Sequence, residues 1–116
     1  MQKRTVLYIH GMGGGADSRI PSILRERINS MIPEDFGLFI DVIVRTYDFD
    51  PDIADGQIRS WIEELQPSLI IGESLGSIHA LRIKGLPHLL VSPALNAPVY
   101  LSAPDISSVR VVQSPM

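Results

Sequence analysis

The sequence contains no cysteine, which excludes disulfide bonds, thiol catalysis and cysteine-based metal centres. It also lacks any block of basic residues: 10 Lys and Arg stand against 13 Asp and Glu, the formal net charge is −3, and nothing indicates a nucleic-acid partner. No apolar run approaches the roughly 18 residues of a membrane-spanning helix, and no signal-peptide core follows Met1. We therefore expect a cytoplasmic protein that binds neither nucleic acid nor membrane.

The sequence does contain enough apolar residues for one core. Its 116 residues are 45% hydrophobic and 20% charged, which is typical of a single α/β domain spanning residues 1–116. Short apolar runs alternate with segments of helical periodicity. This alternation predicts a doubly wound, mainly parallel sheet of four or five strands with helices on both faces. The expected strands are residues 5–10, 38–44, 69–71, 89–91 and 109–113.

Three helices are expected between the first four strands, and the third of them covers residues 75–84. The first helix should be capped by Asp17 or Ser18 and end at Pro33. The second should be capped by Asp52 or Asp55 and end at Pro67, and the third should end at Gly85. Apolar side chains recur at helical spacing in the first two, so they should face the core. These side chains are Ile20, Ile23, Leu24, Ile28, Met31 and Ile32 in the first helix, and Ile58, Trp61, Ile62 and Leu65 in the second.

The most informative stretch is residues 72–76, which read Gly-Glu-Ser-Leu-Gly between an expected buried strand and an expected helix. A Gly-x-Ser-x-Gly run in that setting is typical of a nucleophile elbow, a sharp and strained turn with the serine at its tip. The small flanking residues keep neighbouring segments from colliding with the turn. Ser74 is therefore the candidate catalytic nucleophile, and the neighbouring Glu73 either contacts substrate or faces solvent.

A second element lies upstream, where residues 10–15 read His-Gly-Met-Gly-Gly-Gly after an apolar strand. Acyl transfer through a serine needs two N–H donors aimed at the developing oxyanion. One comes from the residue after the nucleophile, here Leu75, and the other from a glycine-rich loop after an earlier strand. Met12 is the best candidate for that second donor, and Gly13 is the next. His10 and Gly11 should lie close to the substrate.

With these two elements in this order, the chain resembles the α/β-hydrolase superfamily. Its Tyr-Ile-His-Gly, Gly-Glu-Ser-Leu-Gly and Ser-Pro-Ala segments are similar to those of small bacterial serine esterases of the YqiA-like branch. The resemblance implies hydrolysis of an acyl ester or thioester by Ser74, with no metal and no cofactor. It also implies that His10 has a structural role and bonds loop backbone.

The chain departs from the superfamily pattern after the elbow. The resemblance calls for an acid and then a histidine downstream of the serine. Only His79 and His88 follow Ser74: His79 should point away from the serine along its helix, and His88 should lie at the opposite end of the sheet. Asp105 is the only acid after the elbow, and no histidine follows it. The chain thus resembles the N-terminal portion of a hydrolase, and we expect impaired turnover.

Two other interpretations stay open at this point. The chain could be a non-catalytic α/β domain that acts by binding. The main support for this interpretation is that the acid and the histidine that a serine hydrolase needs are missing. Alternatively, the loop from Gly11 to Gly15 formally matches a dinucleotide fingerprint as Gly11-x-Gly13-x-x-Ala16. That fingerprint requires an acidic residue about 20 residues downstream, where it binds the ribose of the nucleotide. The candidate acid here, Asp48, lies farther along the chain than that. We expect Asp48 and its acidic neighbours to have turn or capping roles.

Self-association is expected as well. In hydrolase strand order the strands would lie as second, first, third, fourth and fifth, and an open edge beside the apolar residues 89–91 would promote pairing with another chain. This predicts, most simply, a homodimer formed through that edge or through residues 94–101.

Overall fold

The computed structural model describes residues 2–11, 19–91 and 109–112, the last of these by backbone alone. These residues form an α/β fold with five strands, three α-helices and a short 3-10 helix. The strands are β1 (Gln2–Ile9), β2 (Leu38–Val44), β3 (Leu69–Glu73), β4 (His88–Val91) and β5 (Val109–Val112). The helices are α1 (Arg19–Met31), η1 (Glu34–Phe36), α2 (Pro51–Leu65) and α3 (Leu75–Leu81). Strands and helices alternate as the sequence predicted.

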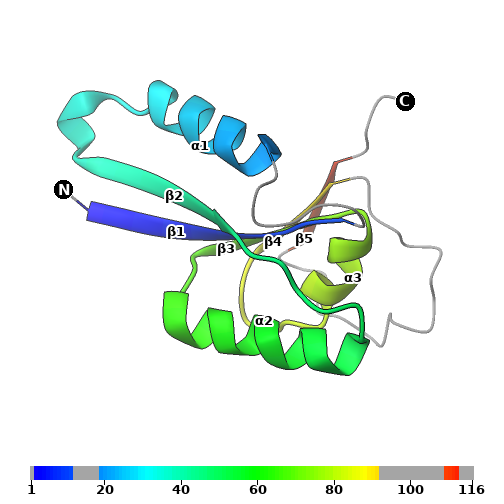
Figure 1. Ribbon diagram of the computed structural model, residues 1–116. Coiled ribbons are helices and arrows are strands. Elements are labelled where there is room, and N and C mark those ends of the chain that lie inside the picture. The colour runs from blue at the N-terminus through cyan, green and yellow to red at the C-terminus, as the bar shows by residue number, and fades with distance from the viewer. Residues whose placement is uncertain (1, 12–18, 92–108, 113–116) are drawn as a thin grey trace.

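The five strands form one sheet in the order β2-β1-β3-β4-β5, and every neighbouring pair is parallel (Figure 1). This is the strand order expected from the sequence. Because the strands are parallel, their carboxyl ends meet at one edge of the sheet, and loops that follow different strands become neighbours there. The loops after β1 and β3 follow adjacent central strands.

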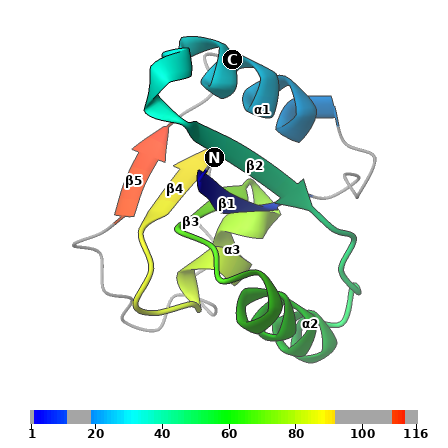
Figure 2. The same cartoon turned by 90° about the vertical axis from the view of Figure 1, so that its left-hand side faces the viewer.

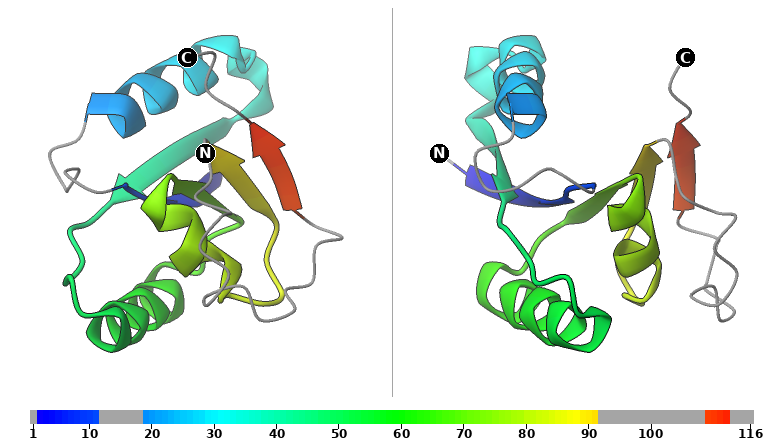
Figure 3. Two further views of the ribbon diagram at one scale, coloured as in Figure 1. Left: turned by 90° about the vertical axis from the view of Figure 1, so that its right-hand side faces the viewer. Right: turned by 45° about the vertical axis from the view of Figure 1, so that its right-hand side comes forward.

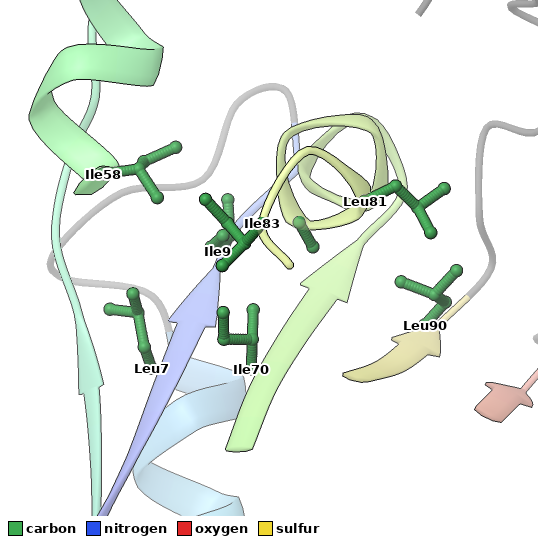
Figure 4. Close-up of a cluster of buried hydrophobic side chains, with 8 residues drawn as sticks. Leu7, Ile9, Ile58, Ile70, Leu81, Ile83 and Leu90 are labelled. Atoms are coloured by element: carbon green, nitrogen blue, oxygen red, sulfur yellow. The ribbon is translucent and has the colours of Figure 1, made fainter. Parts of the chain in front are cut away.

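Helices cover both faces of the sheet: α1 lies on one face, and α2 and α3 lie on the other (Figures 2 and 3). On the α2 and α3 side, eight buried apolar side chains form one cluster, and seven of them are labelled in Figure 4. Ile58 on α2 confirms the buried face expected of that helix, and Trp61, Ile62 and Leu65 are half-buried against the same cluster. The cluster consists of Leu7, Ile9, Ile58, Ile70, Ala80, Leu81, Ile83 and Leu90.

The face covered by α1 is less closed than the sequence suggested. Val6, Tyr8, Val42 and Ile71 are buried on this side, and Leu24 of α1 packs against them. Much of the expected apolar stripe of α1 nevertheless points away from the core: Ile20, Ile23 and Met31 are 49%, 48% and 74% exposed. The reason is position, because α1 packs along β2 at one edge of the sheet and meets neighbours over only part of its surface.

Several element boundaries also differ from expectation. Asp50 caps α2, accepting hydrogen bonds from the N–H groups of Asp52 (2.9 Å) and Ile53 (3.3 Å), so neither Asp52 nor Asp55 is the cap. Pro51 fixes this start, because proline is favoured in the first helical turn. The third helix, α3, ends at Leu81 rather than at residue 84. The expected cap of α1 at residues 17–18 lies outside the described residues.

The open edge expected at β4 is not there, since β5 pairs with β4 along its whole length. Among the described strands, the two edges of the sheet are β2 and β5. Any pairing with a second chain through this side of the sheet would therefore have to use β5, and residues 94–101 lie outside the described part of the chain. Within that described part, no helix is both long enough and apolar enough to cross a bilayer.

Candidate active site

Ser74 lies between the carboxyl end of β3 and the first residue of α3, at the tip of a sharp turn. Its backbone angles are φ 51° and ψ −115°, which a non-glycine residue adopts only under strain. Such a conformation costs about 1–3 kcal/mol and persists only when the surrounding structure enforces it. The turn is therefore the strained strand-to-helix elbow that the motif predicts.

The two glycines of the motif allow the elbow to pack this tightly. A Cβ atom on Gly72 would lie 2.7 Å from the Cα atom of Ser77 and 2.9 Å from the carbonyl oxygen of Gly76. A Cβ atom on Gly76 would lie 2.6 Å from the carbonyl oxygen of His10 and even closer to that of Ile9. Real Cβ atoms do not make contacts this short, so α3 reaches the strands only because both positions lack a side chain.

Gly11 brings the end of β1 against the same elbow. A Cβ atom there would lie 3.1 Å from the Cβ atom of Ser74 and 3.2 Å from the carbonyl oxygen of Glu73. The first glycine of the upstream loop is thus explained by its approach to the serine. This contact places the start of the His-Gly loop beside the elbow, and it accounts for Gly11 without a nucleotide ligand.

Hydrogen bonds hold the elbow in place. The N–H of Ser74 donates to the carbonyl oxygen of Val91 at 2.9 Å, which ties the turn to β4. The carbonyl oxygen of Ser74 accepts from the N–H of Ser77 at 3.0 Å and from its hydroxyl at 2.5 Å. Both backbone groups of the serine are satisfied, so its side chain is the part left for chemistry.

Leu75, the first oxyanion candidate, is the first residue of α3. N–H groups in the first turn of a helix have no acceptor within that helix, so the position suits a donor to an anion. Met12 and Gly13, the candidates for the second donor, lie outside the described residues. The described part of the site therefore contains the candidate nucleophile and one of the candidate oxyanion donors.

Glu73 does not simply face solvent. Its Oε1 atom accepts a hydrogen bond of 2.6 Å from the hydroxyl of Tyr8, whose side chain is only 2% exposed. Burial raises the pKa of Tyr8, and the hydrogen bond and negative charge of Glu73 raise it further. The phenol consequently stays protonated at physiological pH and can donate to Glu73. Tyr8 was not among the predicted site residues.

The buried rings of His10 and His79 form a cluster with the partly buried ring of Tyr47 beside the elbow. The rings of His10 and Tyr47 stack with their centroids 4.3 Å apart, and His79 meets Tyr47 edge-on at 4.8 Å. Tyr47 also donates its hydroxyl proton to the carbonyl oxygen of His10 at 2.7 Å. Nδ1 of His10 lies 2.6 Å from the carbonyl oxygen of Gly11 and donates to it, which agrees with a structural role for His10.

Burial favours the uncharged forms of Tyr47 and His79. It raises the pKa of Tyr47 to about 12, with a further contribution from the charge of Glu73. Burial also lowers the pKa of His79; the positive charge of Arg82 and the neighbouring His10 lower it further, while Asp55 acts in the opposite direction. Nδ1 of His79 has no hydrogen-bond partner among the described residues, so a proton added to this ring would be poorly accommodated; Nε2 of His10 likewise has no partner there.

Acid is therefore expected to destabilise the folded chain through His79. Because folding lowers its pKa, the unfolded chain binds more protons below the ordinary value of about 6.5, so stability is complete above that pH and falls as the pH drops below it. Urea unfolding of the parent and of His79→Gln between about pH 7.5 and about pH 5 measures this effect. The loss of stability in acid should be smaller in the variant, and an unchanged loss would contradict the assignment.

The remaining histidine is remote from the serine. His88 is the first residue of β4, at the amino end of the strands, and its Nε2 atom lies 2.6 Å from the carbonyl oxygen of Ala80. Among the described residues, none of the three histidines makes a hydrogen bond to Ser74. Asp48 accepts from the N–H of Asp50 at 2.9 Å, the turn role that the sequence suggested.

Sequence reasoning missed Tyr8 and Tyr47. A tyrosine in a buried strand needs a partner for its hydroxyl. Tyr8 pairs in register with Ile71, and Glu73 follows two residues later on the same face of the adjacent strand. That signal was available once β1 and β3 were taken as neighbours. Tyr47 follows β2 in an irregular segment, and no periodic pattern indicates its contact with His10.

The described residues include no group of three or more His, Asp or Glu side chains placed to hold a metal ion. Comparison with known proteins adds no assignment, because no protein-family model and no curated protein matches this chain. Any statement of function therefore depends on the geometry of the elbow and its neighbours.

Proposed function

We propose that this chain is the nucleophile-bearing domain of a serine hydrolase of the esterase or thioesterase type, with Ser74 as the nucleophile. The observation that carries the proposal is the backbone of Ser74, at φ 51° and ψ −115° between a central parallel strand and a helix. Strain of this kind clusters at functional sites, where it becomes part of the mechanism. The strained residue also lies at the edge of the sheet where the loops after β1 and β3 meet.

The proposed chemistry is acyl transfer to water. The Oγ atom of Ser74 attacks the acyl carbonyl carbon, the alcohol or thiol leaves with a proton, and water then releases the acid from the acyl-enzyme. The N–H of Leu75 and an N–H from Met12 or Gly13 would hold the oxyanion in both steps. No metal or cofactor takes part in this scheme.

A non-catalytic binding domain is the second candidate, and the histidines favour it. His10 and His79 are buried in the cluster with Tyr47, and His88 lies at the other end of the sheet. Without a base the serine hydroxyl stays protonated and is a weak nucleophile. The two candidates differ in one measurable property, the covalent reactivity of Ser74 in the folded chain.

A fluorophosphonate probe tests this reactivity. The folded chain should be phosphonylated at Ser74 only. The reaction should be slow, and its rate should rise at mildly alkaline pH. Mass spectrometry of the Ser74 peptide should show the adduct. Ser74→Ala should abolish the adduct, whereas Ser60→Ala, which removes an exposed serine of α2, should leave it unchanged. An adduct that persists in Ser74→Ala, or a folded chain that never reacts, would favour the binding domain.

A further inference from the structure

The side chain of Glu73 has only one of its two carboxylate oxygen atoms in use among the described residues. Oε1 accepts from Tyr8, and Oε2 has no hydrogen-bond partner among the described residues. Glu73 is also the residue immediately before Ser74, on the last position of β3. A carboxylate oxygen is thus free among the described residues at the carboxyl end of β3, on the residue next in sequence to the proposed nucleophile.

Tyr8 holds this carboxylate in one place. The phenol ring is buried in the apolar cluster on the α1 side of the sheet, which restricts its movement. A bond of 2.6 Å from a hydroxyl to a carboxylate is in the range of charge-assisted hydrogen bonds, which are about twice as strong as neutral ones. The carboxylate is therefore positioned before any ligand arrives, and a ligand does not have to immobilise it.

The charge of Glu73 acts on two tyrosines of the site, and among the described residues it has no counter-charge in an ion pair. It raises the pKa of Tyr8 on β1 and also that of Tyr47, whose hydroxyl bonds to the end of β1. Among the described residues no Lys, Arg or His side chain forms an ion pair with Glu73; the described ion pairs are Arg25–Asp41, Arg45–Glu64 and Arg59–Asp55. An uncompensated negative charge in a partly buried position attracts a cation and repels an anion.

We propose that Glu73 is the specificity-determining residue of this site and that it selects acyl esters carrying a positive charge close to the ester group. The inference rests on the proposed function, because it names the substrate class of the same site. An ester with an ammonium group would pair with Oε2, a neutral ester would gain no such pairing, and an anionic ester would be repelled by the carboxylate.

Binding of a matched pair of small probes tests the charge preference without requiring catalysis. Choline and 3,3-dimethylbutanol have nearly the same shape and differ in charge, and each is titrated into the labelled chain while the amide signals of Glu73 and Leu75 are followed by NMR. Choline should bind about tenfold more tightly at low ionic strength, and the ratio should fall as salt screens the charge. Equal affinities for the two probes would overturn the proposal.

Two variants connect the preference with Glu73. Glu73→Gln keeps an oxygen for Tyr8 but removes the charge, so the affinity ratio should fall to about one. Tyr8→Phe keeps the charge but frees the carboxylate, so the ratio should fall only part of the way. An undiminished preference in Glu73→Gln would also overturn the proposal. Because these titrations need no nucleophile, a cation preference together with an unreactive Ser74 would reject the hydrolase and leave the binding specificity standing.

Discussion

Replacing Gly76 by alanine is expected to cost about 3 kcal/mol or more of folding stability, the upper end of what overpacking usually costs. The added Cβ atom would lie 2.6 Å from the carbonyl oxygen of His10 and nearer still to that of Ile9. Both are backbone atoms at the end of β1, a central strand paired on both sides. The clash has no flexible side chain to absorb it, so either α3 moves off the sheet or the β1–β3 pairing breaks.

Gly56 provides the matched control. It lies within α2, is exposed, and a Cβ atom added there would have nothing within 4 Å. Gly56→Ala should therefore stabilise the chain by about 0.5–1 kcal/mol, because alanine is the better helix former. Urea unfolding followed by circular dichroism measures both variants. A Gly76→Ala chain as stable as Gly56→Ala would show that α3 does not approach β1 so closely.

The second large effect is a deficit in turnover. We expect this chain to hydrolyse p-nitrophenyl acetate no faster than about 10³–10⁴ times the rate in water, the residual acceleration of a hydrolase that has lost triad members. The sequence has three histidines, and none forms a hydrogen bond to Ser74 among the described residues. Initial rates of the parent and of Ser74→Ala, at equal concentrations, measure the deficit.

Added imidazole sharpens this experiment. If the missing part is a general base, imidazole in solution should raise the rate of the parent more than it raises the rate of Ser74→Ala, where only buffer catalysis remains. A high rate without imidazole that disappears in Ser74→Ala would contradict the expectation. In that case the general base would be either a residue outside the described part of the chain or His10 after it has moved toward Ser74.

The features predicted correctly from the sequence are those encoded locally. Each strand contains a short apolar run, although β1 begins three residues earlier than expected, at Gln2. The strand-to-helix junction is marked by Gly72 and Gly76, one on either side of the Glu-Ser-Leu triplet. The strand order followed from the resemblance and was confirmed. The cap of α2 was misassigned because this segment contains several aspartates that could cap a helix. Pro51 occupies the first helical position, so the residue before it, Asp50, is the cap.

The features that were missed depend on contacts between distant segments. Helical spacing marked Ile20, Ile23 and Met31 as core residues, but spacing does not reveal how much of the sheet a helix covers. The bond from Tyr8 to Glu73 joins residues 65 positions apart, and the bond from Tyr47 to His10 joins residues 37 apart. Such pairs become predictable only after strand neighbours and register are known.

The strand order also has a consequence for how the chain acquires its fold during synthesis. Once β1 and β2 have paired, β3, β4 and β5 join one after another on the same side, in the order in which a ribosome releases them. No strand has to insert between two that are already paired. The sheet can therefore grow outward from its N-terminal pair, which fits vectorial folding of domains from the N-terminus. The last backbone bond of the elbow forms when β4 arrives, because the N–H of Ser74 bonds to Val91.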